Sequence, residues 1–271
     1  MKGIIGAIAG DVIGSAYEFN PTRDHNFELF TPKSTFTDDT VLTMANALWL
    51  LEDEQHTHES LVRIMLDMCW KYPGRGYGGR FATWINDDDP QPYNSFGNGS
   101  AMRVSPVGYY ARTLDEALDL AKISAEVTHN HPEGIKGAQA TAAAIWMARK
   151  GRTKQEICAY IEQTYGYDLH KTWEFWHPIY GWEDSCQGTV PQAIICFLDS
   201  TDFEDAIRKA VSLGGDSDTL ACITGGIAEA FFGGVPKAMA ERVMRSFPEA
   251  FKRVLEGVRT RTEYGQRCKL L

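Results

Sequence analysis

The sequence has few basic residues for its number of acidic ones. It carries 27 Lys and Arg against 36 Asp and Glu over 271 residues, which gives a formal net charge of -9 at pH 7. This balance repels phosphate backbones over most of the surface, so we expect no general nucleic-acid binding. An anionic ligand would have to be captured by local hydrogen-bond donors or by metal ions.

Long hydrophobic runs are also lacking. No stretch reaches the roughly 18 uninterrupted apolar residues of a membrane helix, so we expect no membrane association. The short apolar run near the start is broken by Gly6, Gly10 and Asp11 and lacks the length and cleavage pattern of a signal peptide. We therefore expect a cytoplasmic protein.

Paired cysteines are missing as well. The six cysteines are scattered, contain no C-x-x-C pair, and several have apolar neighbours. This spacing argues against a zinc site, and a disulfide framework belongs to much shorter secreted chains. We expect reduced, buried thiols at Cys69, Cys158, Cys186, Cys196, Cys222 and Cys268.

Alternation of apolar and polar residues at period two is nearly absent, whereas helical spacing recurs along the chain. Leu42, Ala45, Leu48 and Trp49 are one example. The pattern predicts an all-α protein. Beyond the runs at 41–51 and 61–68, we expect helices near 114–127, 134–150, 153–165, 187–198, 203–212, 217–232, 236–245 and 247–260.

The organisation of the chain favours one domain spanning residues 1–271. Hydrophobic residues make up 44% of the sequence, which suits a folded core, and no low-complexity linker or fixed-period repeat divides it. The small residues at 138–144 suit a helix at the centre of a bundle. Two stretches, 17–36 and 71–100, predict long loops, which in compact domains are usually functional.

Two acidic motifs each come just before a predicted helix. Thr37-Asp38-Asp39-Thr40 alone is typical of a helix start, with Thr37 as N-cap and acidic residues in the first turn. In the second motif, Asp216 and Asp218 would diverge in a regular helix. They can converge only at an irregular turn, which Gly214-Gly215 supplies.

Carboxylate and hydroxyl oxygens without nearby Cys or His suit Mg²⁺, Mn²⁺ or Ca²⁺ rather than zinc. If the two motifs meet, four aspartates would repel one another strongly unless cations lay between them. The charges alone are consistent with two ions.

Five segments of the chain carry small, acidic and hydroxyl residues in a distinctive order. They are Gly10-Asp11-Val12-Ile13-Gly14-Ser15 with Glu18, Thr37-Asp38-Asp39-Thr40, Gly97-Asn98-Gly99-Ser100-Ala101-Met102-Arg103, Thr128-His129, and Gly214-Gly215-Asp216-Ser217-Asp218-Thr219. In order and spacing these segments together resemble the ADP-ribosylglycohydrolases, the relatives of the dinitrogenase reductase-activating glycohydrolase.

The resemblance implies a single-domain orthogonal helical bundle with a binuclear Mg²⁺ or Mn²⁺ centre at the floor of a cleft. The implied metal ligands are Thr37, Asp38, Asp39, Asp216, Asp218 and Thr219. Glu18 is implied to lie on a loop at this centre and to act as a gate or as a catalytic carboxylate, although Glu18 alone would be a solvated loop residue. The other expected catalytic carboxylates are Asp38 and Asp39. Asp11 is expected to support the fold or the ligands.

The resemblance also implies an ADP-ribose site. A Gly-rich turn at a helix start can hold an anion on its backbone N–H groups, and the family uses this segment around the diphosphate and distal ribose. His129 is implied to contact the ADP-ribose, although histidines at helix ends often only cap carbonyls. The expected binding residues are Ser95, Phe96, Gly97, Asn98, Gly99, Ser100, Met102 and His129.

The implied function is hydrolysis of ADP-ribose from a modified protein side chain, with arginine preferred, or from a related ADP-ribosyl compound. The expected partner is the ADP-ribosylated substrate, and we expect a monomer. Two alternatives remain. Paired aspartates with Mg²⁺ also serve phosphohydrolases, and some relatives are non-catalytic binders, although those typically have eroded metal motifs.

Overall fold

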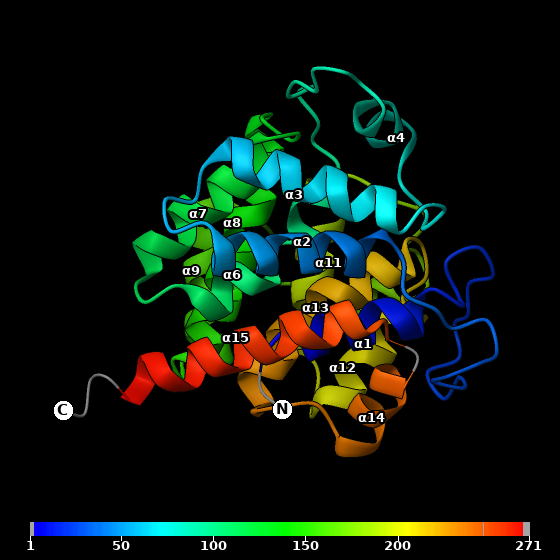
Figure 1. Ribbon diagram of the computed structural model, residues 1–271. Helices are drawn as coiled ribbons and strands as arrows, with labels where there is room; N and C mark the ends of the chain where they lie inside the picture. Colours follow the sequence, from blue (N-terminus) through cyan, green and yellow to red (C-terminus); the bar gives the residue numbers. More distant parts are fainter. Residues whose placement is uncertain (1–2, 246, 268–271) are drawn as a thin grey trace.

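The protein is built from helices alone, apart from a single bridge between Gly97 and Ser185, over the part that is described. A computed structural model describes residues 3–245 and 247–267, with side chains through residue 260 (Figure 1). The prediction of an all-α protein is confirmed. In chain order the helices are α1 Ile5–Gly14, α2 Asp38–Glu52, α3 His58–Lys71, α4 Gly79–Ile85, α5 Gly99–Met102, α6 Ser105–Tyr110, α7 Leu114–Glu126, α8 Pro132–Arg149, α9 Lys154–Tyr165, α10 Trp173–Trp176, α11 Cys186–Leu198, α12 Phe203–Ser212, α13 Ser217–Phe232, α14 Lys237–Arg245 and α15 Glu249–Arg267.

Helix α13 lies at the centre of the bundle, in contact with α1, α8, α11 and α12. Its residues from Ser217 to Glu229 are all buried, which explains why small side chains occur around its whole circumference. The alanines of α8 at 138, 140, 142, 143 and 144 are fully buried, as their pattern predicted. Close approach between these helices fixes the position of the N-terminus of α13.

The tightest contact in the bundle joins α1 to α13. A Cβ added at Gly10 would lie 2.0 Å from the Ala221 carbonyl oxygen, and one at Gly14 would lie 2.5 Å from the Ser217 carbonyl oxygen. At such distances only glycine, which has no Cβ atom, fits at these two positions. Sequence analysis predicted no helix in this segment, and α1 forms because close packing against α13 offsets the low helix propensity of its glycines.

The two predicted loops are only partly loops. Residues 15–36 contain no regular helix, but the 71–100 stretch contains α4 and the start of α5. Phe81, Trp84 and Ile85 bury one side of α4, which shows why this short segment is helical. Both stretches lie beside the helix ends where the acidic motifs occur.

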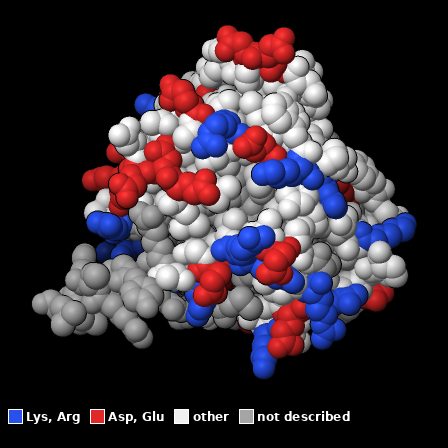
Figure 2. All heavy atoms as spheres, in the orientation of Figure 1, with Lys and Arg blue, Asp and Glu red and all other residues white. Residues whose placement is uncertain are grey.

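The surface carries both signs of charge on the face shown in Figure 2, where basic and acidic side chains are interspersed and acidic ones gather above α4. None of the described helices has the length and hydropathy needed to cross a membrane. The cysteines at 69, 158, 186, 196 and 222 are free thiols, and Cys268 lies outside the described residues.

Candidate metal centre

The first acidic motif forms the N-terminus of α2 and is held there by Asp11. Thr37 is the N-cap, and its hydroxyl accepts a hydrogen bond from the Asp39 backbone N–H, as predicted. The buried Asp11 carboxylate accepts from the backbone N–H and hydroxyl of both Thr37 and Thr40. Asp11 therefore fastens α1 to the start of α2, which is the supporting role the sequence predicted for it.

The second acidic motif forms the N-terminus of α13. Gly214 and Gly215 both have positive φ values, 78° and 73°, so the chain turns sharply before Asp216. Asp216 is the N-cap residue and lies outside helical geometry, with ψ at 76°. This irregular turn lets Asp216 and Asp218 converge, as the sequence predicted.

The two motifs meet. The hydroxyl of Thr219 donates to Asp39 Oδ2 across 3.3 Å. Carboxylate oxygens of Asp11, Asp39 and Asp218 lie within 4.8 Å of one another, and so do those of Glu18, Asp216 and Asp218. Asp218 belongs to both groups and joins them into one acidic cluster.

Charge repulsion and burial dominate this cluster. Burial, together with the charges of Asp11, Asp38 and Asp216, raises the pKa of Asp39 well above its usual range. Burial and the charges of Asp39 and Asp216 raise the pKa of Asp218 in the same way. Asp39 Oδ1 is buried and has no hydrogen-bond partner among the described residues. An unpaired oxygen of this kind in an all-oxygen acidic donor set fits a hard divalent cation.

Asp38 borders the cluster on another side. Its backbone N–H donates to the Arg75 carbonyl, and a Cβ at Gly76 would lie 3.3 Å from its Oδ1. Burial and the charges of Asp11 and Asp216 raise its pKa well above the usual range. The loop that follows α3 therefore forms a wall beside this carboxylate.

Glu18 lies half-buried on the loop that follows α1. Burial and the charges of Asp216 and Asp11 raise its pKa to about 7. The next residue, Phe19, is 83% exposed and stacks on the exposed Trp182 with 5.9 Å between ring centroids. Glu18 is thus a titratable carboxylate at the edge of the cluster, beside an exposed aromatic pair.

Arg23 anchors the loop between α1 and α2 that also contains Glu18. Its guanidinium donates to the carbonyls of His177 and Tyr180, between α10 and α11, and to that of Leu213, just before the glycine turn of α13. The loop therefore packs over the chain segments that position Asp216. Sequence analysis did not identify Arg23, because carbonyl contacts from a loop arginine leave no pattern in the sequence.

The Gly-rich loop before α5 reaches the cluster through Asn98. Its side-chain amide donates to Asp216 Oδ2 at 2.7 Å and to the Thr189 hydroxyl at 3.2 Å. The backbone N–H groups of Gly97 and Asn98 are already bonded, to Ser95 Oγ and the Asp184 carbonyl. These two backbone N–H groups are therefore not available to bind an anion, contrary to the prediction for this turn.

The other predicted binding residues divide into two sets. Phe96 is 45% exposed, and His129 lies with its ring against Gly97 and Gly99. In contrast, Ser100 is fully buried and its hydroxyl donates to the Gly134 carbonyl. Met102 is also buried, and its sulfur lies 3.9 Å from the Thr219 hydroxyl. Ser100 and Met102 therefore support the site from below, whereas Phe96 and His129 border it.

His131 has a different role from a carbonyl cap. It is the N-cap residue of α8, and its Nδ1 accepts a hydrogen bond from the Glu133 backbone N–H. His131 therefore caps a backbone N–H at a helix start rather than carbonyls at a helix end. The proline that follows it occupies the first helical position, where a missing N–H has no cost.

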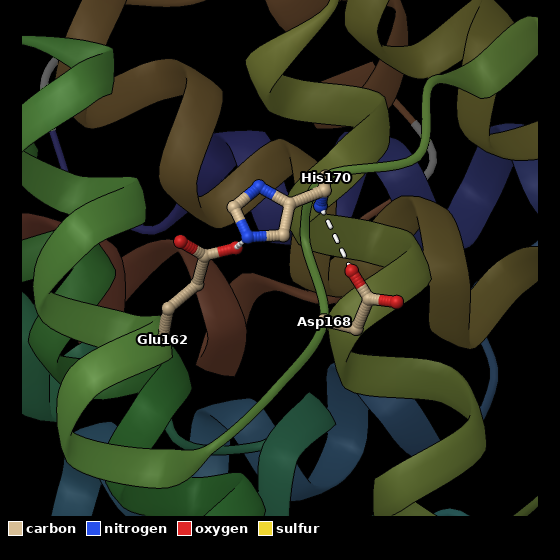
Figure 3. Close-up of side chains that lie close together, drawn as sticks. All are labelled: Glu162, Asp168 and His170. Carbon is tan, nitrogen blue, oxygen red and sulfur yellow. Dashed lines mark hydrogen bonds and ion pairs between the residues drawn. The ribbon is translucent and has the colours of Figure 1, made fainter.

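A separate group of possible metal-binding side chains lies at the end of α9. Figure 3 shows Glu162, Asp168 and His170 close together. His170 Nε2 pairs with Glu162 at 3.4 Å, and its backbone N–H donates to Asp168. The His170 side chain is 83% exposed. The ion pair and the hydrogen bond already account for the arrangement of these three residues, and two of the three are exposed. We therefore assign this group no function.

Comparison with known proteins identifies the family and several relatives of this chain. The family model for ADP-ribosylglycohydrolase matches residues 1–266. ADP-ribosylhydrolase ARH3 from Homo sapiens is 26% identical, covering 94% of this chain and 88% of that protein. ADP-ribosylarginine hydrolase Tri1 from Pseudomonas putida (strain GB-1) is 25% identical, covering 89% and 72%.

A solved structure described as an ADP-ribosylglycohydrolase-related protein complex has the same fold. It superposes with a TM-score of 0.73 at 24% identity and covers 96% of each chain. The structural likeness shows the fold, and the family model spans nearly the whole sequence. The chain therefore belongs to the ADP-ribosylglycohydrolase family of hydrolases.

Proposed function

We propose that this protein hydrolyses the glycosidic bond between ADP-ribose and an acceptor, using two Mg²⁺ or Mn²⁺ ions held at the acidic cluster. The observation that carries this proposal is the meeting of the α2 and α13 N-termini around the unpaired Asp39 Oδ1. Membership of the family and the names of the relatives support the ADP-ribosyl substrate class.

The proposed metal ligands are hard oxygen donors from two helix starts. They are Thr37, Asp38, Asp39, Asp216, Asp218 and Thr219. Divalent cations, when bound, supply positive charge that orients ribose hydroxyls and makes a water molecule more acidic. Asp11 holds Thr37 in place, and Asn98 holds Asp216.

The chain's own carboxylates handle the proton. Glu18 is half-buried at the edge of the cluster, where its carboxylate can accept a proton from a water molecule and return it. Asp38 and Asp39 supply further negative charge next to it. Such charge favours the positive character that develops on the ribose as a glycosidic bond breaks.

The acceptor that we propose is an arginine side chain. The relative Tri1 is named for ADP-ribosylarginine, and the Glu18 carboxylate at the edge of the acidic cluster attracts a guanidinium. The exposed Phe19 and Trp182 provide flat apolar surfaces on which a guanidinium can stack. We further propose a cytoplasmic monomer, as expected from the sequence.

The deciding experiment compares products from purified protein supplied with Mg²⁺ or Mn²⁺. Chromatography would follow free ADP-ribose from matched arginine-linked and serine-linked peptides, and a colorimetric assay would follow phosphate from simple esters. We expect ADP-ribose release, faster from the arginine-linked peptide. Phosphate release without ADP-ribose would identify a phosphohydrolase. Binding of ADP-ribose with every linkage left intact would identify a non-catalytic relative.

A further inference from the structure

A buried arginine lies below the Gly-rich loop. Arg103 follows α5, is fully buried, and has no carboxylate partner among the described residues. Its Nη2 donates to the Ser124 carbonyl at 2.6 Å and to the Thr128 hydroxyl at 2.9 Å. Ser124 lies in the last turn of α7, so the guanidinium occupies the end of that helix where a positive charge is favoured.

The Thr128 hydroxyl connects this arginine to His129. Thr128 is fully buried, and its Oγ1 lies 2.7 Å from His129 Nδ1. The described part of the chain offers this hydroxyl two hydrogen-bond partners, Arg103 and His129. Arg103, Thr128 and His129 thus form a hydrogen-bonded chain of side chains that runs from the end of α7 to the loop before α5.

The direction of these hydrogen bonds follows from the chemistry of arginine. A guanidinium has only donors, so the Thr128 oxygen must accept from Arg103. Its hydroxyl hydrogen then needs an acceptor, because a buried donor left without one is costly. His129 Nδ1 is the acceptor within reach. If Nδ1 instead carried a hydrogen, the buried threonine hydroxyl would lose this acceptor.

The opposite edge of the imidazole faces the predicted binding loop. A Cβ at Gly99 would lie 3.2 Å from His129 Nε2, and one at Gly97 would lie 3.6 Å from it. Burial, with the charges of Arg103 and Arg80, lowers the pKa of His129 well below its usual range, so the ring is neutral. A neutral ring with a bare Nδ1 carries its hydrogen on Nε2.

We infer that Arg103, acting through Thr128, is a positioning residue that fixes His129 as an Nε2–H donor toward the loop of Gly97, Asn98 and Gly99. The donor selects ligands that offer an oxygen acceptor at this place, such as a phosphate or ribose oxygen, and disfavours groups that can only donate. This inference rests on the proposed function for the identity of the ligand. The tautomer itself does not depend on any activity.

The tautomer can be measured in the ligand-free protein. Nitrogen-15 NMR of imidazole-labelled protein distinguishes a bare ring nitrogen from a protonated one, and His129→Asn identifies the resonance. We expect His129 with bare Nδ1 and protonated Nε2 in the wild type. Thr128→Val should abolish this preference, whereas Thr128→Ser, which keeps the hydroxyl, should retain it. A wild-type spectrum with protonated Nδ1 overturns the inference.

Affinity provides the second measurement. Calorimetry with ADP-ribose should show about tenfold weaker binding for Thr128→Val, the worth of one hydrogen bond, and near wild-type binding for Thr128→Ser. Thr141→Val is the matched control, because Thr141 is similarly buried and its hydroxyl has no hydrogen-bond partner in the described part of the chain.

The outcomes separate this inference from the proposed function. Equal losses in Thr128→Val and Thr141→Val, or an unchanged tautomer in Thr128→Val, would contradict the positioning role. If Thr128→Val does not fold, the wild-type and Thr128→Ser spectra still decide the tautomer. A protein with the expected tautomer that fails to bind ADP-ribose would remove the proposed function and leave the positioning role standing.

Discussion

Thr219 and Asp39 lie 180 positions apart in the chain, and the Thr219 hydroxyl donates to Asp39 Oδ2 across 3.3 Å. This contact joins the first turns of α2 and α13, the two helices that carry the acidic motifs. Each helix start brings carboxylates to one place, and neither alone contains enough ligands for a metal pair. The packing of α1 against α13, with Asp11 fastened to α2, brings the two halves together.

Removing one charge from the cluster should separate activity from stability. We expect Asp39→Asn to reduce turnover by at least a hundredfold, because it removes a ligand charge at nearly constant shape. Without divalent ions the variant should melt roughly 2–4 °C higher, since losing one repulsive carboxylate is worth about 1 kcal/mol. Calorimetry and an ADP-ribose release assay measure both effects. Asp119→Asn, on an exposed part of α7, is the control and should change neither.

Divalent ions should stabilise the fold directly. At a hundredfold excess over the dissociation constant, each bound Mn²⁺ adds about 2.7 kcal/mol, which corresponds to a rise in Tm of roughly 5–10 °C per ion. Differential scanning calorimetry with Mn²⁺, with Mg²⁺ and with K⁺ at equal ionic strength would test this. A rise of the same size with K⁺ would mean that general screening, rather than a bound ion, is responsible.

The metal-free protein should become less stable as the pH rises. The pKa of Glu18 is raised to about 7 and that of Glu229 to about 8, so the folded state binds protons more tightly than the unfolded state. Stability that is present below pH 4.5 is therefore lost between pH 5 and 8. Urea unfolding in the presence of a chelator would measure this slope. Glu18→Gln should flatten it, and a slope of the opposite sign would refute the assignment of these shifts.

The contact between α1 and α13 should tolerate no added methyl group. Gly10→Ala is expected to destabilise the protein by about 3 kcal/mol, because the new Cβ would overlap the Ala221 carbonyl. Gly79→Ala is the matched control, since a Cβ at this helical glycine meets nothing within 4 Å. We expect the control to be neutral or slightly stabilising. Equal denaturation midpoints for the two variants would show that the helices can move apart freely.

The acidic halves of the site were predictable because their signals are local. Thr37 precedes two acidic residues and an apolar run, which is typical of an N-cap, and the glycine pair before Asp216 marks a turn. Helix α1 was missed because three glycines lower its intrinsic propensity, and only its packing against α13 makes it helical. The short helix α4 was missed because it buries one turn of apolar residues between long loops.

Other parts of the site depend on long-range packing and could not be predicted. The predicted role of Ser100 in binding assumed an accessible loop, whereas the structure buries it against Gly134. The connection from Arg103 through Thr128 to His129 requires the end of α7 to lie beneath α5. A sequence pattern gives residue types and local periodicity, and it does not give this relative position of two helices.

The central claim is that residues 37–39 and 216–219 together bind a pair of divalent cations. Its most direct test is an anomalous difference map from crystals grown with Mn²⁺ and ADP-ribose. We predict two peaks, both within coordination distance of carboxylates from the two helix starts, with Asp39 and Asp218 among the ligands. A map with no peak between α2 and α13, although Mn²⁺ is in excess, would contradict the account.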